Sequence, residues 1–241
     1  MLKLTVYATP HSVKDQELWG KTAIAVDVLR ATSTIVAAFG AGCRECYPAT
    51  TLEEARAMHR TLGSQTLLGG ERNGLPPEDF DLGNSPREYT SDRLKGRSLV
   101  FATTNGTLAI RRTGRSRHGL MGTLANARAV ALKAIQLRRD IVIICAGTQG
   151  RFSLEDTIGA GAIVDSLLKQ GQKLALTDLA TAAGDLFTQH GSKLLELLRR
   201  SVHGQTLMRL GFEEDLTYCA QLNVSDVVPV YHGTSIRSQL P

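Results

Sequence analysis

Acidic, hydroxyl, amide and arginine side chains follow four apolar runs of this 241-residue chain, at the point where each run ends. The runs are TAIAVDV (22–28), QTLLGG (65–70), SLVFATT (98–104) and DIVIICAG (140–147). The polar residues at their ends are Asp27, Arg30, Thr32 and Ser33; Glu71, Arg72 and Asn73; Thr103, Thr104, Asn105 and Thr107; and Cys145, Thr148, Gln149, Arg151, Glu155 and Asp156. Hydrophobic packing does not require such a set, whereas a site for a phosphate and a divalent cation does.

Two kinds of ligand chemistry support this interpretation. Mg²⁺ prefers oxygen ligands, commonly one or two carboxylates together with water and phosphate oxygens. The candidate carboxylates are Asp27, Glu71, Asp81 and either Glu155 or Asp156. A phosphate is bound by backbone N–H groups at helix N-termini, by hydroxyl donors and by arginine. The segments RATST (30–34) and TTNGT (103–107) place such groups where a helix is expected to begin.

Each feature also has a purely structural explanation. Asp27 could accept hydrogen bonds from backbone amides at a strand end, and Thr32 and Ser33 could be helix caps. Ser153 and Asp156 fit the S-x-x-D pattern of a capping box, and Asp81 lies in a segment rich in turn residues, NGLPPEDFDLGNSP (73–86). Four such strand ends in succession favour a functional site over four unrelated structural features.

Two other phosphatase mechanisms can be compared with the sequence. Cys145 and Arg151 have the C-x5-R spacing of cysteine-dependent phosphatases, in which a thiolate attacks phosphorus. Phe152 separates this arginine from the expected helix start at Ser153, so a small buried residue is the preferred role for Cys145 and a nucleophile is the alternative. Phosphatases of the haloacid dehalogenase type need an acid two residues after Asp27, and Leu29 stands there.

The elements that would position these residues alternate along the chain. Nearly all-apolar runs are typical of strands buried on both faces, and each is followed by a helical pattern, including 31–42, 51–63, 126–139 and 154–171. After residue 172 a strand (173–178) precedes mainly helical segments (193–211 and 212–222) and a short strand (227–231). We therefore expect a three-layer α/β/α fold with a largely parallel, mixed sheet. Residues 1–241 are expected to form one compact domain, with a subdivision near 172 as the alternative.

Composition narrows the possible partners. The formal net charge is +5, and the basic stretch RRTGRSRHG (111–119) contains no aromatic residue on which a base could stack, which favours a small anionic ligand over nucleic acid. No apolar run is long enough to span a bilayer, and the first residues lack the apolar core of a signal peptide. We expect a cytoplasmic protein with reduced cysteines, because the C-x-x-C formed by Cys43 and Cys46 has no second pair at zinc-site spacing. A homo-oligomer remains open.

Five segments together, DVLRATST, GGERNG, FDLGNSP, TTNGT and CAGTQGRFSLEDTIGAG, resemble the 2-phosphosulfolactate phosphatase (ComB) family, and SVHGQTLMRLG and DVVPV extend the similarity more weakly. The resemblance implies an α/β fold of three layers and a magnesium-dependent hydrolysis of 2-phospho-3-sulfolactate to 3-sulfolactate and phosphate. It matches Asp27, Glu71, Asp81, Glu155 and Asp156 to acidic positions, our candidate Mg²⁺ ligands. It matches Arg30, Thr32, Ser33, Asn105 and Thr107 to polar positions, our candidate phosphate contacts. Arg72 and Arg151 could meet the carboxylate or sulfonate of the substrate.

The leading hypothesis is a hydrolase in which Asp27 and Glu71 are the catalytic acids and water attacks the phosphate monoester. One alternative is the same chemistry on another phosphorylated 2-hydroxycarboxylic acid. Another is a non-catalytic protein that binds a phosphorylated metabolite through the same loops. The surplus of carboxylates argues against the last alternative, because acids beside an anion repel it.

Overall fold

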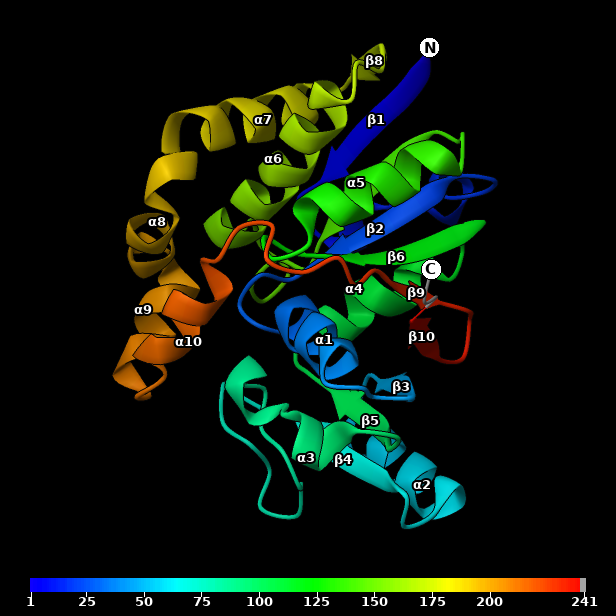
Figure 1. The fold of residues 1–241 in the computed structure, drawn as a ribbon, viewed down its shortest axis with the longest axis vertical. Helices are drawn as coiled ribbons and strands as arrows, with labels where there is room; N and C mark the ends of the chain where they lie inside the picture. Colours follow the sequence, from blue (N-terminus) through cyan, green and yellow to red (C-terminus); the bar gives the residue numbers. More distant parts are fainter. Residues whose placement is uncertain (239–241) are drawn as a thin grey trace.

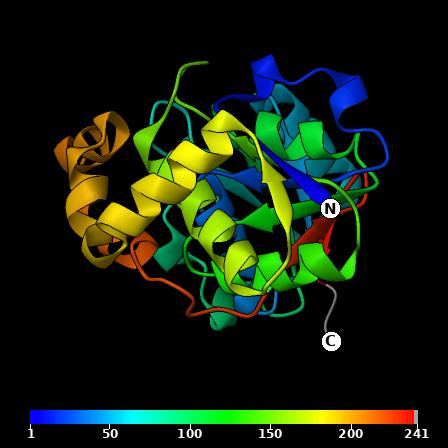
Figure 2. The same cartoon turned by 90° about the horizontal axis from the view of Figure 1, so that it is seen from above.

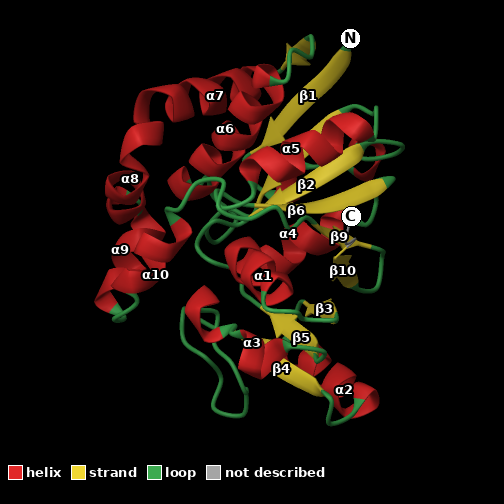
Figure 3. Cartoon of the chain, in the orientation of Figure 1, coloured by secondary structure: helices red, strands yellow, loops and turns green. Residues whose placement is uncertain are grey.

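The computed structural model describes residues 1–238 and has one mixed sheet with helices on both faces (Figures 1 and 3). The strands are β1 (Leu2–Tyr7), β2 (Thr22–Val26), β3 (Glu45–Ala49), β4 (Thr66–Gly70), β5 (Ser98–Ala102), β6 (His118–Gly122), β7 (Ile141–Cys145), β8 (Leu174–Leu176), β9 (Pro229–Tyr231) and β10 (Ile236–Ser238). The helices are α1 (Ala31–Gly40), α2 (Leu52–Leu62), α3 (Ser91–Leu94), α4 (Gly106–Thr113), α5 (Ala127–Gln136), α6 (Leu154–Lys169), α7 (Asp178–His190), α8 (Leu194–Arg200), α9 (Val202–Arg209) and α10 (Glu213–Cys219). Single turns of 3-10 helix occur at Pro10–Ser12, Asp15–Glu17, Pro86–Glu88 and Gly191–Lys193.

The sheet contains two parallel blocks. In the order β4-β5-β3-β10-β9-β6-β2-β7-β1-β8, the first three strands are mutually parallel and so are the last five. The short strands β10 and β9 lie between them, and the pairings β3–β10, β10–β9 and β9–β6 are all antiparallel. Three successive reversals turn the second block against the first. In a flat sheet, the carboxyl ends of β4 and β5 would therefore lie at the opposite edge from those of β2 and β7. The twist of a β-sheet supplies the missing rotation, because each neighbouring strand is turned relative to the last.

The side chains of β2 show how helices cover both faces. Ile24 and Val26 belong to a buried cluster with α5, α6 and α7, whereas Ala23 and Ala25 belong to a second cluster with α1 and α4. This alternation is the two-residue period of a strand buried on both faces. A smaller cluster lies under α2, against β3, β4 and β5. The predicted α/β architecture with a largely parallel, mixed sheet is confirmed.

Residues after 172 share the sheet with those before it. β8 pairs with β1 at one edge, and β9 and β10 fill the centre, so the chain forms one compact unit. Helices α8, α9 and α10 (orange in Figures 1 and 2) stand together at one side of the molecule. Within residues 1–238, no helix combines the length and the apolar character needed to cross a membrane.

Candidate active site

A cavity of about 250 Å³ lies where the two blocks of the sheet meet α9. Its walls come from the segments that follow β2, β4, β5 and β7, together with one face of α9. The lining residues are Asp27, Leu29, Arg30, Glu71, Asn73, Gly74, Asn84, Thr103, Thr104, Asn105, Thr148, Gln149, Val202, His203 and Thr206. All four strand ends singled out in the sequence thus contribute to one cavity, despite the reversal of strand direction.

Asp27 stands directly after β2 and is 6 % exposed. Its Oδ1 accepts a hydrogen bond from the Ala31 backbone at 3.1 Å. The other oxygen lies against Gly106, where a Cβ atom would come within 2.5 Å of Oδ2, so only glycine leaves room for the carboxylate. The pKa of Asp27 is raised to about 7, chiefly by burial and also by the nearby charges of Glu71 and Glu155, against the opposing effects of the Ala31 backbone N–H and of Arg30. The carboxylate lacks the positive charge that its ionised form requires.

Glu71 stands directly after β4 and is 7 % exposed. Its Oε2 accepts from the Gly74 backbone at 2.8 Å and from the Thr104 hydroxyl at 3.1 Å, and its Oε1 accepts from the Thr104 backbone at 2.7 Å. These three hydrogen bonds fix the Glu71 carboxylate between the turn after β4 and the segment after β5.

The acids of α6 have different surroundings. Both oxygens of Asp156 are occupied at 2.9 Å, Oδ1 by the Val28 backbone and Oδ2 by the Gly147 backbone. Asp156 therefore clamps the segments after β2 and β7 together, and its backbone N–H also donates to the cap residue Ser153. The pKa of Asp156 is raised by burial and by the charges of Asp27 and Glu155. Its assignment as a Mg²⁺ ligand is corrected to a structural role.

Glu155 is 3 % exposed, and no hydrogen bond or ion pair of its carboxylate is found within residues 1–238. Its charge raises the pKa of Asp27 and of Asp156 and also acts on His203. Asp27, Glu71 and Glu155 are therefore a group of neighbouring acids with little compensating charge.

Arg30 lines the cavity, but its guanidinium is largely occupied. Nη1 lies 2.7 Å from Oδ2 of Asp215 in an ion pair whose side chains are both 1 % exposed, and Nη2 donates to the Gly74 carbonyl at 2.8 Å. The guanidinium also stacks over the Phe212 ring, 4.4 Å from its centroid. Arg30 thus ties α10 to the turn after β4, and its charge is offset by Asp215. The prediction of a direct phosphate contact is replaced by this role.

Three predicted phosphate contacts prove to be local structural bonds. The Thr32 hydroxyl donates to the carbonyls of Asp27 and Gly122 and accepts from the Asp27 backbone. Ser33 donates to the Val28 carbonyl, and Thr107 donates to the Thr103 carbonyl. All three are buried outside the cavity lining and bond backbone carbonyls, so their role is structural, although none of them caps its helix.

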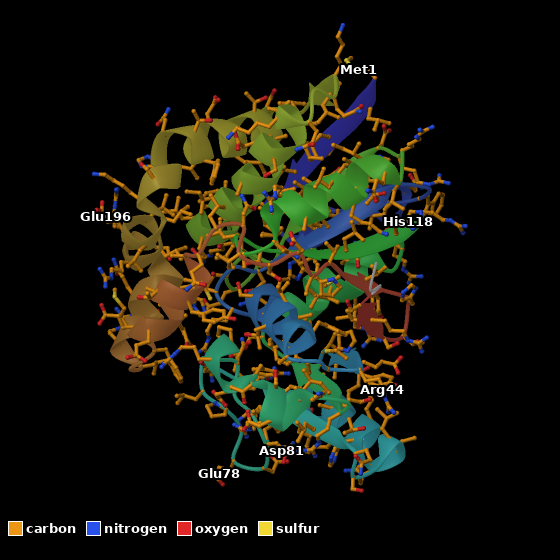
Figure 4. All side chains as sticks on the ribbon, in the orientation of Figure 1. Met1, Arg44, Glu78, Asp81, His118 and Glu196 are labelled. Carbon is orange, nitrogen blue, oxygen red and sulfur yellow. The ribbon has the colours of Figure 1, made fainter. Side chains whose placement is uncertain are left out.

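Four further candidates lie outside the cavity. Arg72 donates to the carbonyls of Glu71 and Thr50, and the Arg151 side chain is exposed. Asp81 is exposed, accepts from the Leu68 backbone at 2.8 Å, and sits near Glu78 at the end of the molecule that carries β4 and α2 (Figure 4). Cys145 is wholly buried at the end of β7, and burial beside Asp156 and Glu155 raises the pKa of its thiol well above its usual value. A buried thiol with a raised pKa is poorly suited to act as a nucleophile, which favours the role of a small buried residue for Cys145.

The structure places Asn105 in the cavity wall, as expected, where its Oδ1 accepts from the Gln149 backbone at 3.2 Å. It also adds residues that the strand-end argument missed. His203 of α9 lines the cavity together with Leu29. Burial lowers the pKa of His203 and Arg30 lowers it further, while the charges of Glu155 and Glu71 act in the opposite direction. Its segment, SVHGQ, belongs to the weaker part of the family resemblance, and that was the available signal.

Comparison with known proteins identifies the family of this chain. A family model described as "2-phosphosulpholactate phosphatase" matches residues 7–234. The chain belongs to the 2-phosphosulfolactate phosphatase family. A relative from Carboxydothermus hydrogenoformans is 42 % identical over 231 residues, covering 96 % of this chain and 94 % of that protein. One from Clostridium acetobutylicum is 38 % identical over 235 residues, covering 98 % of this chain and 100 % of that protein. Both relatives carry the name "Probable 2-phosphosulfolactate phosphatase".

The cavity of this 2-phosphosulfolactate phosphatase family member fits a magnesium ion that keeps part of its water shell. Within residues 1–238, no three His, Cys, Asp or Glu side chains are grouped so as to enclose a metal by themselves. Mg²⁺ does not require such a group, because it commonly keeps several waters and uses one or two carboxylates together with substrate phosphate oxygens. Asp27 and Glu71 supply two carboxylates to one cavity, and a cation beside them would offset the charge that burial makes unfavourable on Asp27.

Proposed function

We propose that this protein is a Mg²⁺-dependent phosphatase that hydrolyses 2-phospho-3-sulfolactate, the phosphate monoester of a 2-hydroxy acid, to 3-sulfolactate and phosphate. The observation that carries the proposal is the pair Asp27 and Glu71, two buried carboxylates in one cavity with little positive charge between them. A cavity that only bound an anion would gain nothing from such a pair. Family membership supports the same activity, since the relatives are named for it.

Asp27 and Glu71 would hold the ion, and Glu155 would add negative charge close behind them. When bound, the ion would polarise phosphoryl oxygens and offset the charge that develops on them. The hydroxyl of Thr103 and the amides of Asn105 and Gln149 stand at the ends of β5 and β7, where they can donate to phosphoryl oxygens. The chain itself would thus bind and orient the phosphate from one side of the cavity.

His203 is suited to receive the proton of the attacking water. Its lowered pKa keeps the ring neutral at pH 7. The unprotonated ring nitrogen can then accept a proton as the water oxygen bonds to phosphorus. As the ester P–O bond breaks, the leaving oxygen takes up a proton and leaves as the hydroxyl of the 2-hydroxy acid.

The deciding experiment measures phosphate release from a panel of 2-phospho acids, with Mg²⁺ and with EDTA. We expect turnover of 2-phosphosulfolactate only when Mg²⁺ is present, and a loss of about 10³-fold in Asp27→Asn and Glu71→Gln. Near-normal rates in both variants would remove the metal-site assignment. Faster turnover of another phosphorylated 2-hydroxycarboxylic acid would keep the chemistry and change the substrate. Tight binding without phosphate release at any Mg²⁺ concentration would identify a non-catalytic binding protein.

The wider setting is part of the same proposal. We propose that the enzyme acts in the cytoplasm, because the four cysteines are free and buried as expected for a reducing compartment. Its partner would be a small anionic substrate rather than nucleic acid. The oligomeric state can be read from the elution volume of the purified chain.

A further inference from the structure

Asp215 of α10 lies outside the cavity, yet it is connected to one of the proposed catalytic acids through a continuous chain of buried hydrogen bonds. Asp215 is 1 % exposed, and both of its oxygens are used. Oδ2 pairs with Arg30 at 2.7 Å, and Oδ1 accepts from the Ser85 hydroxyl at 2.6 Å. An ion pair this deeply buried loses much of its Coulomb energy to desolvation, so stability alone is a weak reason for its presence.

Arg30 carries the connection across the cavity wall. While Nη1 holds Asp215, Nη2 donates to the Gly74 carbonyl at 2.8 Å. The Gly74 backbone N–H in turn donates to Oε2 of Glu71 at 2.8 Å. The three groups Asp215, Arg30 and Gly74, which we call the Arg30 bridge, therefore end on the Glu71 carboxylate.

The turn that carries Gly74 also packs against the C-terminal helices. Gly74 has a φ of +85°, and a Cβ atom there would come within 2.7 Å of Leu210 Cδ1, at the end of α9. The neighbouring Asn73 has a φ of 55° and lines the cavity. Asn73 and Gly74 thus both keep a positive φ, which L-residues rarely adopt, at the point where the turn meets α9 and Arg30.

We propose that Asp215 is a positioning residue: by fixing Arg30, and through it Gly74, it sets the direction of the Glu71 carboxylate in the cavity. The C-terminal helices would then contribute to catalysis at a distance as well as through His203. This inference rests on the proposed function, because the group it positions is one of the two acids assigned to the cation.

The test compares Asp215→Asn with Leu216→Ala in the full-length protein. Leu216 is the next residue of α10, is wholly buried, and lies outside both the cavity and the Arg30 bridge, so its truncation weakens the same helix by packing alone. Ser85→Ala is a milder second variant for the case in which Asp215→Asn does not fold, because it removes one bond of Asp215 and leaves the ion pair intact. The readouts are kcat and KM, Mn²⁺ binding followed by electron paramagnetic resonance, and hydrogen exchange of the peptide covering residues 71–75.

For Asp215→Asn we expect kcat to fall about 10- to 100-fold with KM changed less than about 3-fold, because a displaced catalytic group costs turnover more than ground-state binding. Mn²⁺ affinity should fall roughly 10-fold, the usual effect of removing a group that orients a metal ligand. Exchange in residues 71–75 should accelerate. Ser85→Ala should change the same quantities in the same direction by a smaller factor, whereas Leu216→Ala should lower Tm and leave kcat and Mn²⁺ affinity within about 2-fold.

Equal losses of kcat and Mn²⁺ affinity in Asp215→Asn and Leu216→Ala would overturn the positioning role. Unchanged hydrogen exchange of residues 71–75 in Asp215→Asn would also overturn it. If Asp215→Asn is insoluble, a Ser85→Ala variant with wild-type kcat and wild-type hydrogen exchange would overturn the positioning role instead. A wild-type protein that releases no phosphate would instead refute the proposed function, and Mn²⁺ binding together with hydrogen exchange would still decide whether Asp215 controls the Glu71 turn.

Discussion

Replacing Asp27 by asparagine should abolish activity and at the same time stabilise the metal-free protein. The pKa of Asp27 is raised from its usual 3.8 to about 7, so its ionised form is disfavoured in the folded state. Three pKa units correspond to about 4 kcal/mol, which is an upper bound on what the ionised carboxylate costs the fold at pH 8. Asparagine is of equal size, carries no charge, and keeps an oxygen that can accept from the Ala31 backbone.

The sign of the pH dependence follows from the raised pKa. A carboxyl whose folded-state pKa is raised contributes stability that is fully present below pH 3.8 and is lost as pH rises through about 7. Between pH 8 and pH 5 the wild type should therefore gain roughly 2–3 kcal/mol of unfolding free energy relative to Asp27→Asn. The two proteins should differ most at pH 8, where Asp27→Asn unfolds at a Tm roughly 6–12 °C higher.

The assay is guanidinium unfolding of both proteins in EDTA at pH 5 and pH 8, with Tm measured in parallel. Gly40→Ala serves as a neutral control, because a Cβ atom at Gly40 meets nothing within 4 Å. Two results would refute the claim that the ionised Asp27 carboxylate lowers the unfolding free energy at pH 8. One is an Asp27→Asn variant that is less stable than wild type at pH 8. The other is a stability difference between variant and wild type that is the same at both pH values. Adding Mg²⁺ should stabilise the wild type at pH 8 and have little effect on the variant.

Three further predictions concern residues in the cavity and next to it. Gly106→Ala should lower activity strongly and lower the unfolding free energy by about 1–3 kcal/mol, because its Cβ would lie 2.3 Å from Ala31 Cβ and 2.5 Å from Asp27 Oδ2. Steady-state kinetics and denaturant unfolding test this prediction, and wild-type turnover would contradict it. Cys145→Ala should keep kcat within about 3-fold of wild type and lower the unfolding free energy by about 1–2 kcal/mol, because the thiol is wholly buried. Activity that survives EDTA but disappears in this variant would restore the thiol mechanism. The apparent Kd for Mg²⁺ should rise about 5-fold from pH 7 to pH 6, because protons compete for Asp27. Calorimetric titration at both pH values measures it, and a pH-independent Kd would exclude Asp27 as a ligand.

The sequence predicted the strands that are buried on both faces, because their apolar runs carry the signal locally. It did not predict β6, whose sequence HGLMG contains two glycines and follows a basic stretch. Those glycines are there for packing: a Cβ atom at Gly122 would lie 2.7 Å from Ile24 Cγ2 and 2.8 Å from Ile163 Cδ1. Nor did it predict the reversal of strand direction, because β9 and β10 are three residues each and pair with strands far away in the chain. Pairings of that kind have no local pattern.

The candidate site was predictable where a residue's role depends on its own strand. Asp27 and Glu71 were found because an acid directly after a buried strand must point to the strand end. Thr32 has the same local context, but its hydroxyl partner is the Gly122 carbonyl, 90 positions away, and only the folded structure shows that it is satisfied. His203 was missed for the corresponding reason, because its position beside the cavity depends on how α9 packs and not on its neighbours in sequence.

The charge of the cavity explains why the substrate and the cation should depend on each other. Asp27 and Glu71 line it together with one arginine, and the charge of Arg30 is already offset by Asp215. Arg72 and Arg151, which could have met the carboxylate and sulfonate of the substrate, lie outside the lining. A multiply charged phosphate ester would enter a cavity of its own sign, and a cation between its phosphate and the two carboxylates removes the repulsion on both sides. If the proposed function holds, the same acids would therefore make binding of the anion conditional on Mg²⁺.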